Sequence, residues 1–358
     1  MVKFEKVCID NGAYEAASFV DVNNDGKLDI VCGAYWYEAP SWKKHKICDV
    51  RAEGEYFDDF SAIPMDVNGD GWIDIITGGW WGKTLRWREN PKGQPVEWKE
   101  YEIDACGSIE TTRAYDIDGD GIPEIFPNTP GNPVVYYKLV TDTNGKGTGK
   151  FKKVVLFDGK SGHGQGFGDI DGDGKPEIIL RNGWLKQSSI TGGMWELRKE
   201  FELGNSSVEI IVHDINGDGL NDLIVGHAHG YGLNWWEQKV VDGVRQWVKH
   251  EIDPTTSQYH DLRMADIDND GKLELVTGRR YRAHCGKDPG DNDPVCVCYF
   301  KINDGKFEKN VVDYGPVPGH SGVGIYFDIA DINGDGWLDI IAPGKEGLYL
   351  FINKGIQG

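Results

Sequence analysis

The stretch Asp169-Ile-Asp-Gly-Asp-Gly-Lys-Pro-Glu177 decides the fold, because the chain carries seven copies of it. The other copies occupy residues 21–29, 66–74, 116–124, 214–222, 266–274 and 331–339, and all follow the pattern D-[VI]-[DN]-x-D-G-x-x-[DE]. Oxygen side chains in positions 1, 3 and 5, followed by a glycine turn, form the first half of a calcium loop of EF-hand type. The second half differs, because the last carboxylate stands in position 9 and no glutamate arrives in position 12.

We therefore expect structural Ca²⁺ in these acidic loops, held by side-chain oxygens. The predicted ligands stand in positions 1, 3, 5 and 9 of each copy: Asp21, Asn23, Asp25, Asp29, Asp66, Asn68, Asp70, Asp74, Asp116, Asp118, Asp120, Glu124, Asp169, Asp171, Asp173, Glu177, Asp214, Asn216, Asp218, Asp222, Asp266, Asp268, Asp270, Glu274, Asp331, Asn333, Asp335 and Asp339.

Each acidic loop is expected to join two strands. An aliphatic pair such as Ile178-Ile179 follows the loop, which is typical of a strand. A third, aromatic strand comes next, as in residues 35–38, and a fourth has the pattern Trp-x-x-His/Tyr-x-Ile, as in residues 42–47. Four antiparallel strands in each of seven repeats predict an all-β chain, a seven-bladed β-propeller that forms a single domain over residues 1–358. The acidic loops would then all lie on one face.

The two ends of the chain are expected to meet. After the seventh loop only two strand patterns remain, residues 338–341 and 348–352. The missing fourth strand matches the spacing of residues 4–9 at the start of the chain. We expect this N-terminal strand to complete the last blade and to remove the exposed edges of the ring.

Charge and cysteine content limit the partners that the chain is expected to have. The net charge is −20, and the seven loops supply 24 of the 58 acidic side chains. Such a surface makes nucleic acids and anionic membranes poor partners. No apolar run is long enough to span a membrane, and the first residues lack the core of a signal peptide. The seven cysteines do not have the spacing of a disulfide framework, so we expect reduced cysteines and a cytoplasmic protein. The sequence does not indicate an oligomeric state.

The loops resemble the FG-GAP/VCBS repeats of integrin α-chain propellers and of many bacterial carbohydrate-active propellers. The resemblance covers nearly the whole chain and implies the propeller fold. It does not imply one function, because such repeats occur in adhesion proteins, lectin-like modules and lyases alike.

Propeller topology predicts where a functional site lies. Residues just before each first strand and just after each second strand are at the ends opposite to the acidic loops, where they converge over the central channel. Five histidines map there, one of which is His320, and the other four, with Glu110 or Asp261, could hold a divalent metal such as Zn²⁺, Mn²⁺ or Ca²⁺. Equally, one of them could act as a general base. These four histidines are His163, His227, His229 and His260.

Arginines and aromatic residues map to the same face. Guanidinium groups suit a carboxylate or carbonyl-bearing ligand, and aromatic rings stack on sugars, although packing between blades is the alternative role for the aromatic residues. The candidates for binding a small carbohydrate or glycoside are Trp36, Trp80, Glu110, Tyr231, Arg280 and His320.

The long segment 281–294, with His163, His260 and Gly-His-Ala-His at 226–229, is similar to the propellers of aldos-2-ulose dehydratase and rhamnosyl-glucuronate lyase. This resemblance implies a lyase or dehydratase that performs β-elimination on an acidic or keto sugar. Two other functions stay open: a non-catalytic carbohydrate- or protein-binding propeller, and a hydrolase that uses paired carboxylates such as Asp58 and Asp59. For the elimination, the expected catalytic residues are His163, His260, Arg279, Arg113 and Tyr326.

Overall fold

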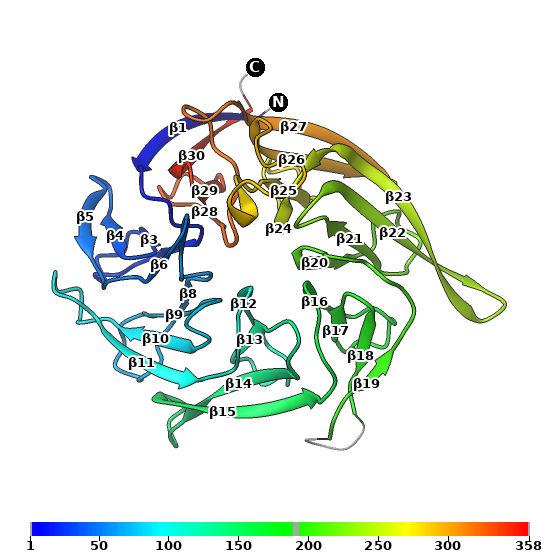
Figure 1. Ribbon diagram of the computed structural model, residues 1–358, viewed down its shortest axis with the longest axis horizontal. Helices are drawn as coiled ribbons and strands as arrows, with labels where there is room; N and C mark the ends of the chain where they lie inside the picture. The colour runs from blue at the N-terminus through cyan, green and yellow to red at the C-terminus, as the bar shows by residue number, and fades with distance from the viewer. Residues whose placement is uncertain (1, 189–192, 357–358) are drawn as a thin grey trace.

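The computed structural model describes residues 2–188 and 193–356. Within these ranges the chain is built from β-strands, and its one helical segment is a single 3₁₀ turn, η1 (Ala283–Cys285). The prediction of an all-β chain is therefore confirmed. Figure 1 shows the strands arranged around a common centre, which gives the molecule a propeller-like architecture.

The strands associate in units of four. Five units are separate sheets, and two more are joined into one eight-stranded sheet by parallel pairing of β16 with β20. The units are β2 (Ala17–Val20), β3 (Asp29–Cys32), β4 (Tyr35–Glu38), β5 (Lys43–Lys46); β8 (Ile63–Met65), β9 (Asp74–Gly78), β10 (Leu85–Glu89), β11 (Lys99–Asp104); β12 (Thr111–Tyr115), β13 (Glu124–Asn128), β14 (Val134–Thr141), β15 (Gly147–Phe157); β16 (Gln165–Gly168), β17 (Glu177–Leu180), β18 (Gly183–Lys186), β19 (Glu196–Arg198); β20 (Val208–His213), β21 (Asp222–Gly226), β22 (Tyr231–Val241), β23 (Val244–Ser257); β24 (Tyr259–Ala265), β25 (Glu274–Arg279), β26 (Val295–Asn303), β27 (Lys306–Gly315); and β28 (Asp328–Ala330), β29 (Asp339–Gly344), β30 (Gly347–Ile356), β1 (Val2–Asp10).

Burial falls from the second strand of each unit toward the fourth. The second strands are buried along their whole length, as in β17, because both faces pack against neighbouring units. Their β-branched and aliphatic residues suit such two-sided packing. The fourth strands alternate between exposed and half-buried residues, as in β15, because only one face is covered. The core therefore lies between units, around the centre.

The acidic loops connect the first and second strands and are folded by their own side chains. Asp169 accepts backbone N–H bonds from Gly172 at 2.8 Å and from Gly174 at 2.9 Å. Gly174 has φ +85°, a left-handed conformation that a glycine adopts without strain. At the other end of the loop, Glu177 Oε2 accepts the N–H of Ile170 at 3.1 Å. The repeated carboxylates thus shape the turn as well as carrying charge.

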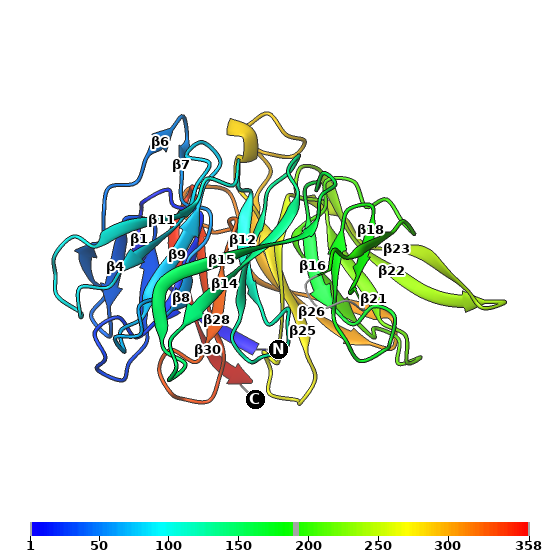
Figure 2. The ribbon, with the colours of Figure 1, turned by 90° about the horizontal axis from the view of Figure 1, so that it is seen from below.

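The first and last strands of the described chain lie side by side. β1 pairs antiparallel with β30, and β30 continues into β29 and β28. The segment predicted as the N-terminal strand, residues 4–9, lies within β1. On one face of the ring, Figure 2 shows η1 projecting together with the hairpin of β6 (Ala52–Glu53) and β7 (Tyr56–Phe57).

All seven cysteines are free thiols, and Cys32, Cys106, Cys296 and Cys298 among them are buried. Along the described ranges, no helix combines the length and the hydrophobicity needed to cross a membrane.

Candidate functional site

Four side chains from four different units meet near the centre of the ring. They are Glu110 just before β12, His163 just before β16, His229 between β21 and β22, and His260 in β24. One ligand atom from each lies within 4.8 Å of those of the other three. The Nε2 atoms of His260 and His163 are 3.0 Å and 3.3 Å from Glu110 Oε1. We call these four residues the histidine cluster.

Hydrogen bonds fix the tautomers of two histidines in the cluster. His163 Nδ1 is 2.8 Å from the carbonyl oxygen of Ser206, and His229 Nδ1 is 2.8 Å from Asp288 Oδ2. Both partners are acceptors, so each Nδ1 carries the proton and each Nε2 presents a lone pair. These two Nε2 atoms are only 3.1 Å apart. Two facing lone pairs repel each other unless a proton or a metal ion lies between them.

The charge states of the cluster suit a cation. Burial lowers the pKa of His229 to about 4 and that of His260 well below its usual range. Burial alone would raise the pKa of Glu110, but the neighbouring His163 and His260 hold it well below its ordinary value. At neutral pH, the imidazoles of His229 and His260 are therefore uncharged beside a carboxylate anion. This donor set is one that Zn²⁺ and other divalent transition metals prefer.

Asp288 and His284 hold the ring of His229 in place. Asp288 accepts from His229 Nδ1, and its other oxygen lies 2.9 Å from His284 Nδ1. The His284 ring stacks on the His229 ring with centroids 4.4 Å apart. A carboxylate behind a histidine is the usual support of a metal ligand. His284 itself is in a left-handed conformation with φ 49°, an uncommon and strained state for a residue other than glycine.

Arg279 and Tyr231 hold the loop that carries these supporting residues, which corrects their expected roles. Arg279 donates to the carbonyl oxygen of Gly290, to that of Asp293 at 2.6 Å and to Ser257 Oγ at 3.1 Å. The Tyr231 hydroxyl donates to Asp293 Oδ2 at 2.5 Å. Both groups are committed to residues 290–293 and away from the histidine cluster. They position the loop and do not contact a ligand there.

Arg280 does border the cluster. Its guanidinium pairs with Glu15 at 2.8 Å, and its Nη1 lies 4.0 Å from Glu110 Oε1. Lys345 adds a second cation, with its Nζ 3.5 Å from the centre of the Tyr56 ring. Positive charge therefore adjoins the carboxylate side of the cluster, where an anionic ligand could approach.

Four aromatic side chains stand beside the cluster, and we call them the aromatic wall: Tyr56, Phe60, Trp80 and Trp81. A small pocket of about 80 Å³ connects the two. Tyr56 and Trp81 have ring centroids 5.0 Å apart, and Phe60 and Trp81 have theirs 5.8 Å apart. The residues that line this pocket are Tyr56, Phe60, Trp80, Trp81, Glu110, Arg280 and His284.

Arg113 and Tyr326, expected to be catalytic, belong to a separate buried network. Arg113 pairs with Asp261 at 2.5 Å and donates to the carbonyl oxygen of Val208. The Tyr326 ring lies near both Arg113 and Arg263, with guanidinium carbons at 4.7 Å and 4.8 Å from its centroid. The charge of Arg113 is therefore paired with the carboxylate of Asp261. Neither Arg113 nor Tyr326 lines the pocket of about 80 Å³ beside the histidine cluster. This corrects their expected roles.

Three further predicted residues lie outside the cluster and the pocket. Trp36 is only 2% exposed and stacks on His45 at 4.3 Å, so it packs between strands. His320 pairs with Asp313 of β27 at 2.8 Å. His227 is not among the residues whose ligand atoms converge, although it is two positions from His229. The chain turns after β21, so residues two positions apart do not point to the same side, and this corrects the expected four-histidine set.

The paired carboxylates of the hydrolase alternative are occupied by the protein itself. Asp58 accepts N–H bonds from Trp81 at 3.0 Å and from Gly82 at 2.6 Å. Asp59 pairs with buried Arg88 at 2.9 Å. These contacts give both carboxylates structural roles in the loop around β7 and β9.

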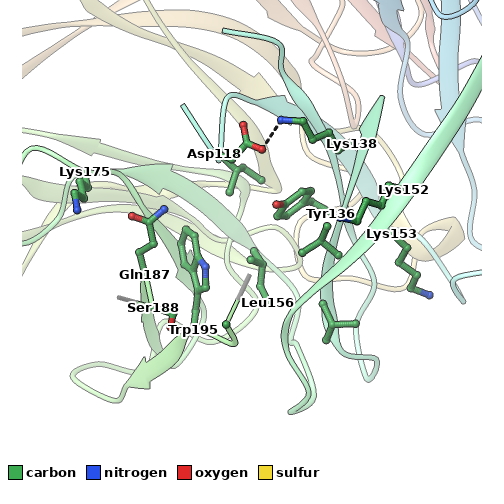
Figure 3. Close-up of a pocket in the computed structure, with 14 residues that line it drawn as sticks. Asp118, Tyr136, Lys138, Lys152, Lys153, Leu156, Lys175, Gln187, Ser188 and Trp195 are labelled. Atoms are coloured by element: carbon green, nitrogen blue, oxygen red, sulfur yellow. Dashed lines mark hydrogen bonds and ion pairs between the residues drawn. The ribbon is translucent and has the colours of Figure 1, made fainter. Parts of the chain in front are cut away.

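A larger pocket lies elsewhere. It measures about 720 Å³, and its lining includes residues of β14 and β15 and residues that follow β18 and precede β19 (Figure 3). Lysines and aromatic residues line it, and Figure 3 shows Lys138 directed at Asp118 of an acidic loop. We therefore choose the candidate site by the convergence of ligand atoms and not by pocket volume.

Several site residues were outside the predicted set. Asp288 and His284 support His229, and Tyr56 forms part of the aromatic wall. Asp288 stands in a segment rich in glycine and aspartate, where no spacing rule distinguishes a supporting carboxylate from a turn residue. Glu110 is predicted both as a further metal ligand and as a substrate-binding residue, and its oxygen lies among the histidine nitrogens.

Comparison with known proteins supports the repeats and the fold. Residues 66–126 and 214–277 match the model of the FG-GAP-like repeat. A T-cell immunomodulatory protein homolog of Plasmodium falciparum (isolate 3D7) is 25% identical over 233 residues, which are 48% of this chain and 32% of that protein. The chain thus spans about a third of the length of this relative.

A solved structure extends the likeness to the whole chain. The crystal structure of Saccharomyces cerevisiae Sqt1 matches with a TM-score of 0.54, covering 98% of each chain at 11% identity. At this identity the likeness concerns the fold alone. The chain is an all-β protein with a propeller-like architecture that contains FG-GAP-like repeats.

Proposed function

We propose that this chain is a non-catalytic recognition protein that binds a divalent transition-metal ion in the histidine cluster and, beside it, a polar ligand such as a carbohydrate. The observation that carries the proposal is the convergence of three imidazole nitrogens and one carboxylate oxygen within 4.8 Å. Ser206 and Asp288 orient two of these imidazoles from behind, as expected of built metal ligands.

The shape of the site favours binding over catalysis. The pocket beside the cluster is about 80 Å³, whereas sites that enclose a small molecule measure roughly 300–1,000 Å³. It can take one polar group or one edge of a ligand, while the rest stays outside. Catalysis usually requires that water be excluded around the reacting atoms. Tyr56, Trp80 and Trp81 of the aromatic wall can stack on a sugar ring held at the metal.

The repeats support the same conclusion. FG-GAP-like repeats form the scaffold, and the distant relative is named for an immunomodulatory role and not for an enzymatic reaction. Recognition of a partner at one face of the ring is consistent with the FG-GAP-like repeats and with the name of this relative.

We also propose that the units close into a seven-bladed propeller. The support is the pairing of β1 with β30. Deleting residues 1–10 should abolish cooperative unfolding, because β30 becomes an exposed edge. Shortening the exposed β22–β23 hairpin is the control. Unchanged unfolding after the deletion would count against closure.

A β-eliminating lyase is the second candidate, and one observation favours it. The Tyr56 hydroxyl and Arg280 both flank the cluster, and burial raises the pKa of Tyr56, so that its phenol keeps its proton. A metal and an arginine could hold a sugar carboxylate while a protonated phenol donates to the leaving oxygen. The expected roles of Arg279, Arg113 and Tyr326 have no place in this arrangement.

The experiment that tests the proposal combines metal content with ligand fate. Protein purified without chelators is analysed for metals, and then titrated with uronides and neutral oligosaccharides with and without that metal. One transition-metal ion per chain and metal-dependent binding without conversion are expected. Absence of transition metal would refute the metal centre. Release of an unsaturated, ultraviolet-absorbing product would replace recognition by the lyase.

A further inference from the structure

The seven acidic loops divide into two types when three positions are compared. Two of the positions are 3 and 9 of the loop. The third lies on the third strand: the residue directly after the loop pairs with one residue of that strand, and the position compared is the next one along the strand. Three loops have Asp, Glu and a lysine at these positions: Asp118, Glu124, Lys138; Asp171, Glu177, Lys186; and Asp268, Glu274, Lys301. The other four have Asn, Asp and no lysine: Asn23, Asp29, Glu38; Asn68, Asp74, Glu89; Asn216, Asp222, Glu237; and Asn333, Asp339, Ile352.

In the first type, which we call lysine loops, the ammonium group lies among the loop carboxylates. Lys186 Nζ is 2.6 Å from Asp171, 2.6 Å from Asp173 and 3.0 Å from Glu177. Three carboxylates from positions 3, 5 and 9 therefore surround one cation. This is the place where a divalent ion would share the same oxygens.

In the other two lysine loops the ammonium also pairs with the carboxylates of positions 3 and 5. Lys138 pairs with Asp118, with Asp120 at 2.6 Å and with Glu124 at 3.4 Å. Figure 3 shows its contact with Asp118. Lys301 pairs with Asp268 and lies 3.5 Å from Asp270.

The choice of Glu or Asp in position 9 follows from this difference. In a lysine loop, Glu177 gives one oxygen to the N–H of Ile170 and keeps the other for Lys186. In the second type, Asp74 uses one oxygen for the N–H of Val67 at 3.0 Å and the other for that of Asn90 at 2.8 Å. The longer glutamate reaches the ammonium, whereas the shorter aspartate stays on the backbone.

The residues at position 3 and on the third strand change together with the residue in position 9. In the second type, which we call asparagine loops, Asn68 donates to Glu89 at 3.3 Å and Asn216 donates to Glu237 at 3.2 Å. In these asparagine loops the loop amide of position 3 faces a carboxylate on the third strand. In the lysine loops the loop carboxylate of position 3 faces an ammonium on the third strand. No lysine at this strand position offsets the acidic side chains of an asparagine loop.

We infer that Lys138, Lys186 and Lys301 are internal counter-cations that close three of the seven acidic loops to divalent ions. Structural Ca²⁺ would then be confined to the four asparagine loops. This inference is independent of the proposed function, since it concerns the loops between first and second strands and not the histidine cluster.

Calcium stoichiometry tests the inference on the full chain, measured by equilibrium dialysis with saturating Zn²⁺ so that the histidine cluster takes up no Ca²⁺. The wild-type chain is expected to bind at most four Ca²⁺ ions. Lys186→Met removes the ammonium without adding a ligand, and it should bind one Ca²⁺ more than the wild type. More than four ions on the wild type, or no gain in the variant, would overturn the inference.

Matched variants separate the internal cation from a general charge effect. Lys175→Met makes the same change of charge at an exposed position of the same loop, and should leave the stoichiometry unchanged. Lys186→Arg keeps the positive charge and should also gain no ion. Lys301→Met repeats the test in another loop, so that misfolding of one variant leaves the other decisive. A gain with Lys175→Met equal to that with Lys186→Met would refute the specific role of the ammonium.

Discussion

The histidine cluster and the acidic loops are two ways of gathering cation ligands in one molecule. Each acidic loop takes its carboxylates from nine consecutive residues, and backbone N–H groups hold them in place. The histidine cluster joins Glu110 to His260 across 150 positions of sequence, and its four residues come from four different units. A loop can therefore form locally, whereas the cluster exists only when the ring is assembled.

The two regions also differ in how they balance charge. The histidine cluster has one carboxylate among three imidazoles, of which His229 and His260 are kept neutral by burial. The acidic loops have an excess of carboxylates, and only the lysine loops carry a lysine of the third strand among them. We therefore expect the cluster to select transition metals and the asparagine loops to select Ca²⁺.

The largest effect is expected from removing a ligand of the cluster. His260→Ala deletes one of four converging ligand atoms, and the affinity for Zn²⁺ should fall by more than roughly 100-fold, beyond the usual effect of losing a supporting residue. Zinc affinity is measured by competition with a chromophoric chelator. His227→Ala, close in sequence but outside the cluster, is the control. Equal affinities of the His260→Ala variant and the wild type would exclude the metal centre.

A smaller effect is expected from the carboxylate that supports His229. Asp288→Asn weakens the hydrogen bond to His229 Nδ1 and should lower zinc affinity by about 10–100-fold. Asp293→Asn alters the same loop without touching the cluster and should have little effect on the metal. If both variants weakened zinc binding equally, Asp288 would act through the loop conformation and not through His229.

The acidic loops predict an unusual dependence of stability on pH. Burial raises the pKa of Asp74 to about 7 and that of Asp29 to about 6. The folded chain then holds these protons to a higher pH than the unfolded chain, so their stabilising contribution is complete below about pH 4 and is lost as the pH rises through 6 to 7. Because the lowered pKa values of His229 and His260 act in the opposite sense up to about pH 6.5, the effect is measured as a difference: in chelator, the Tm of the wild type should fall relative to that of Asp74→Asn between pH 5 and 7.5.

Two additions sharpen this measurement. Added Ca²⁺ should flatten the decline, because it stabilises the ionised carboxylates. Asp74→Asn should make the decline shallower, since the amide does not titrate. Carboxyl groups with lowered pKa, such as Asp253, lose their contribution only in more acidic solution and do not interfere. A difference in Tm between the wild type and Asp74→Asn that stays constant from pH 5 to 7.5 in chelator would contradict the prediction.

The smallest effect concerns the aromatic wall. Trp81→Ala should leave zinc affinity unchanged and weaken the bound carbohydrate by roughly 5–10-fold, since an aromatic contact contributes about 0.5–1.5 kcal/mol beyond its buried area. Isothermal titration with the metal-loaded protein measures both. Loss of zinc together with the sugar would mean that the wall supports the cluster and does not form a separate surface.

The sequence alone determined the repeats, the strand order within each unit and the all-β class. These follow from local rules: the glycine turn of the acidic loop, the aliphatic pair after it and the aromatic third strand. The pattern also predicted that His163, His229 and His260 share one end of the ring, because His163 and His260 stand ahead of an acidic loop near the start of a first strand and His229 follows a second strand.

Only the tertiary structure decided which of these side chains meet. His227 and His229 are two residues apart, yet one joins the cluster and the other does not. Arg279 and Arg280 are adjacent, yet one holds a loop and the other borders the site. Direction and distance across the centre of the ring depend on the packing of all units, which no local pattern encodes. The repeat therefore positions the backbone, and the assembled ring selects the ligands.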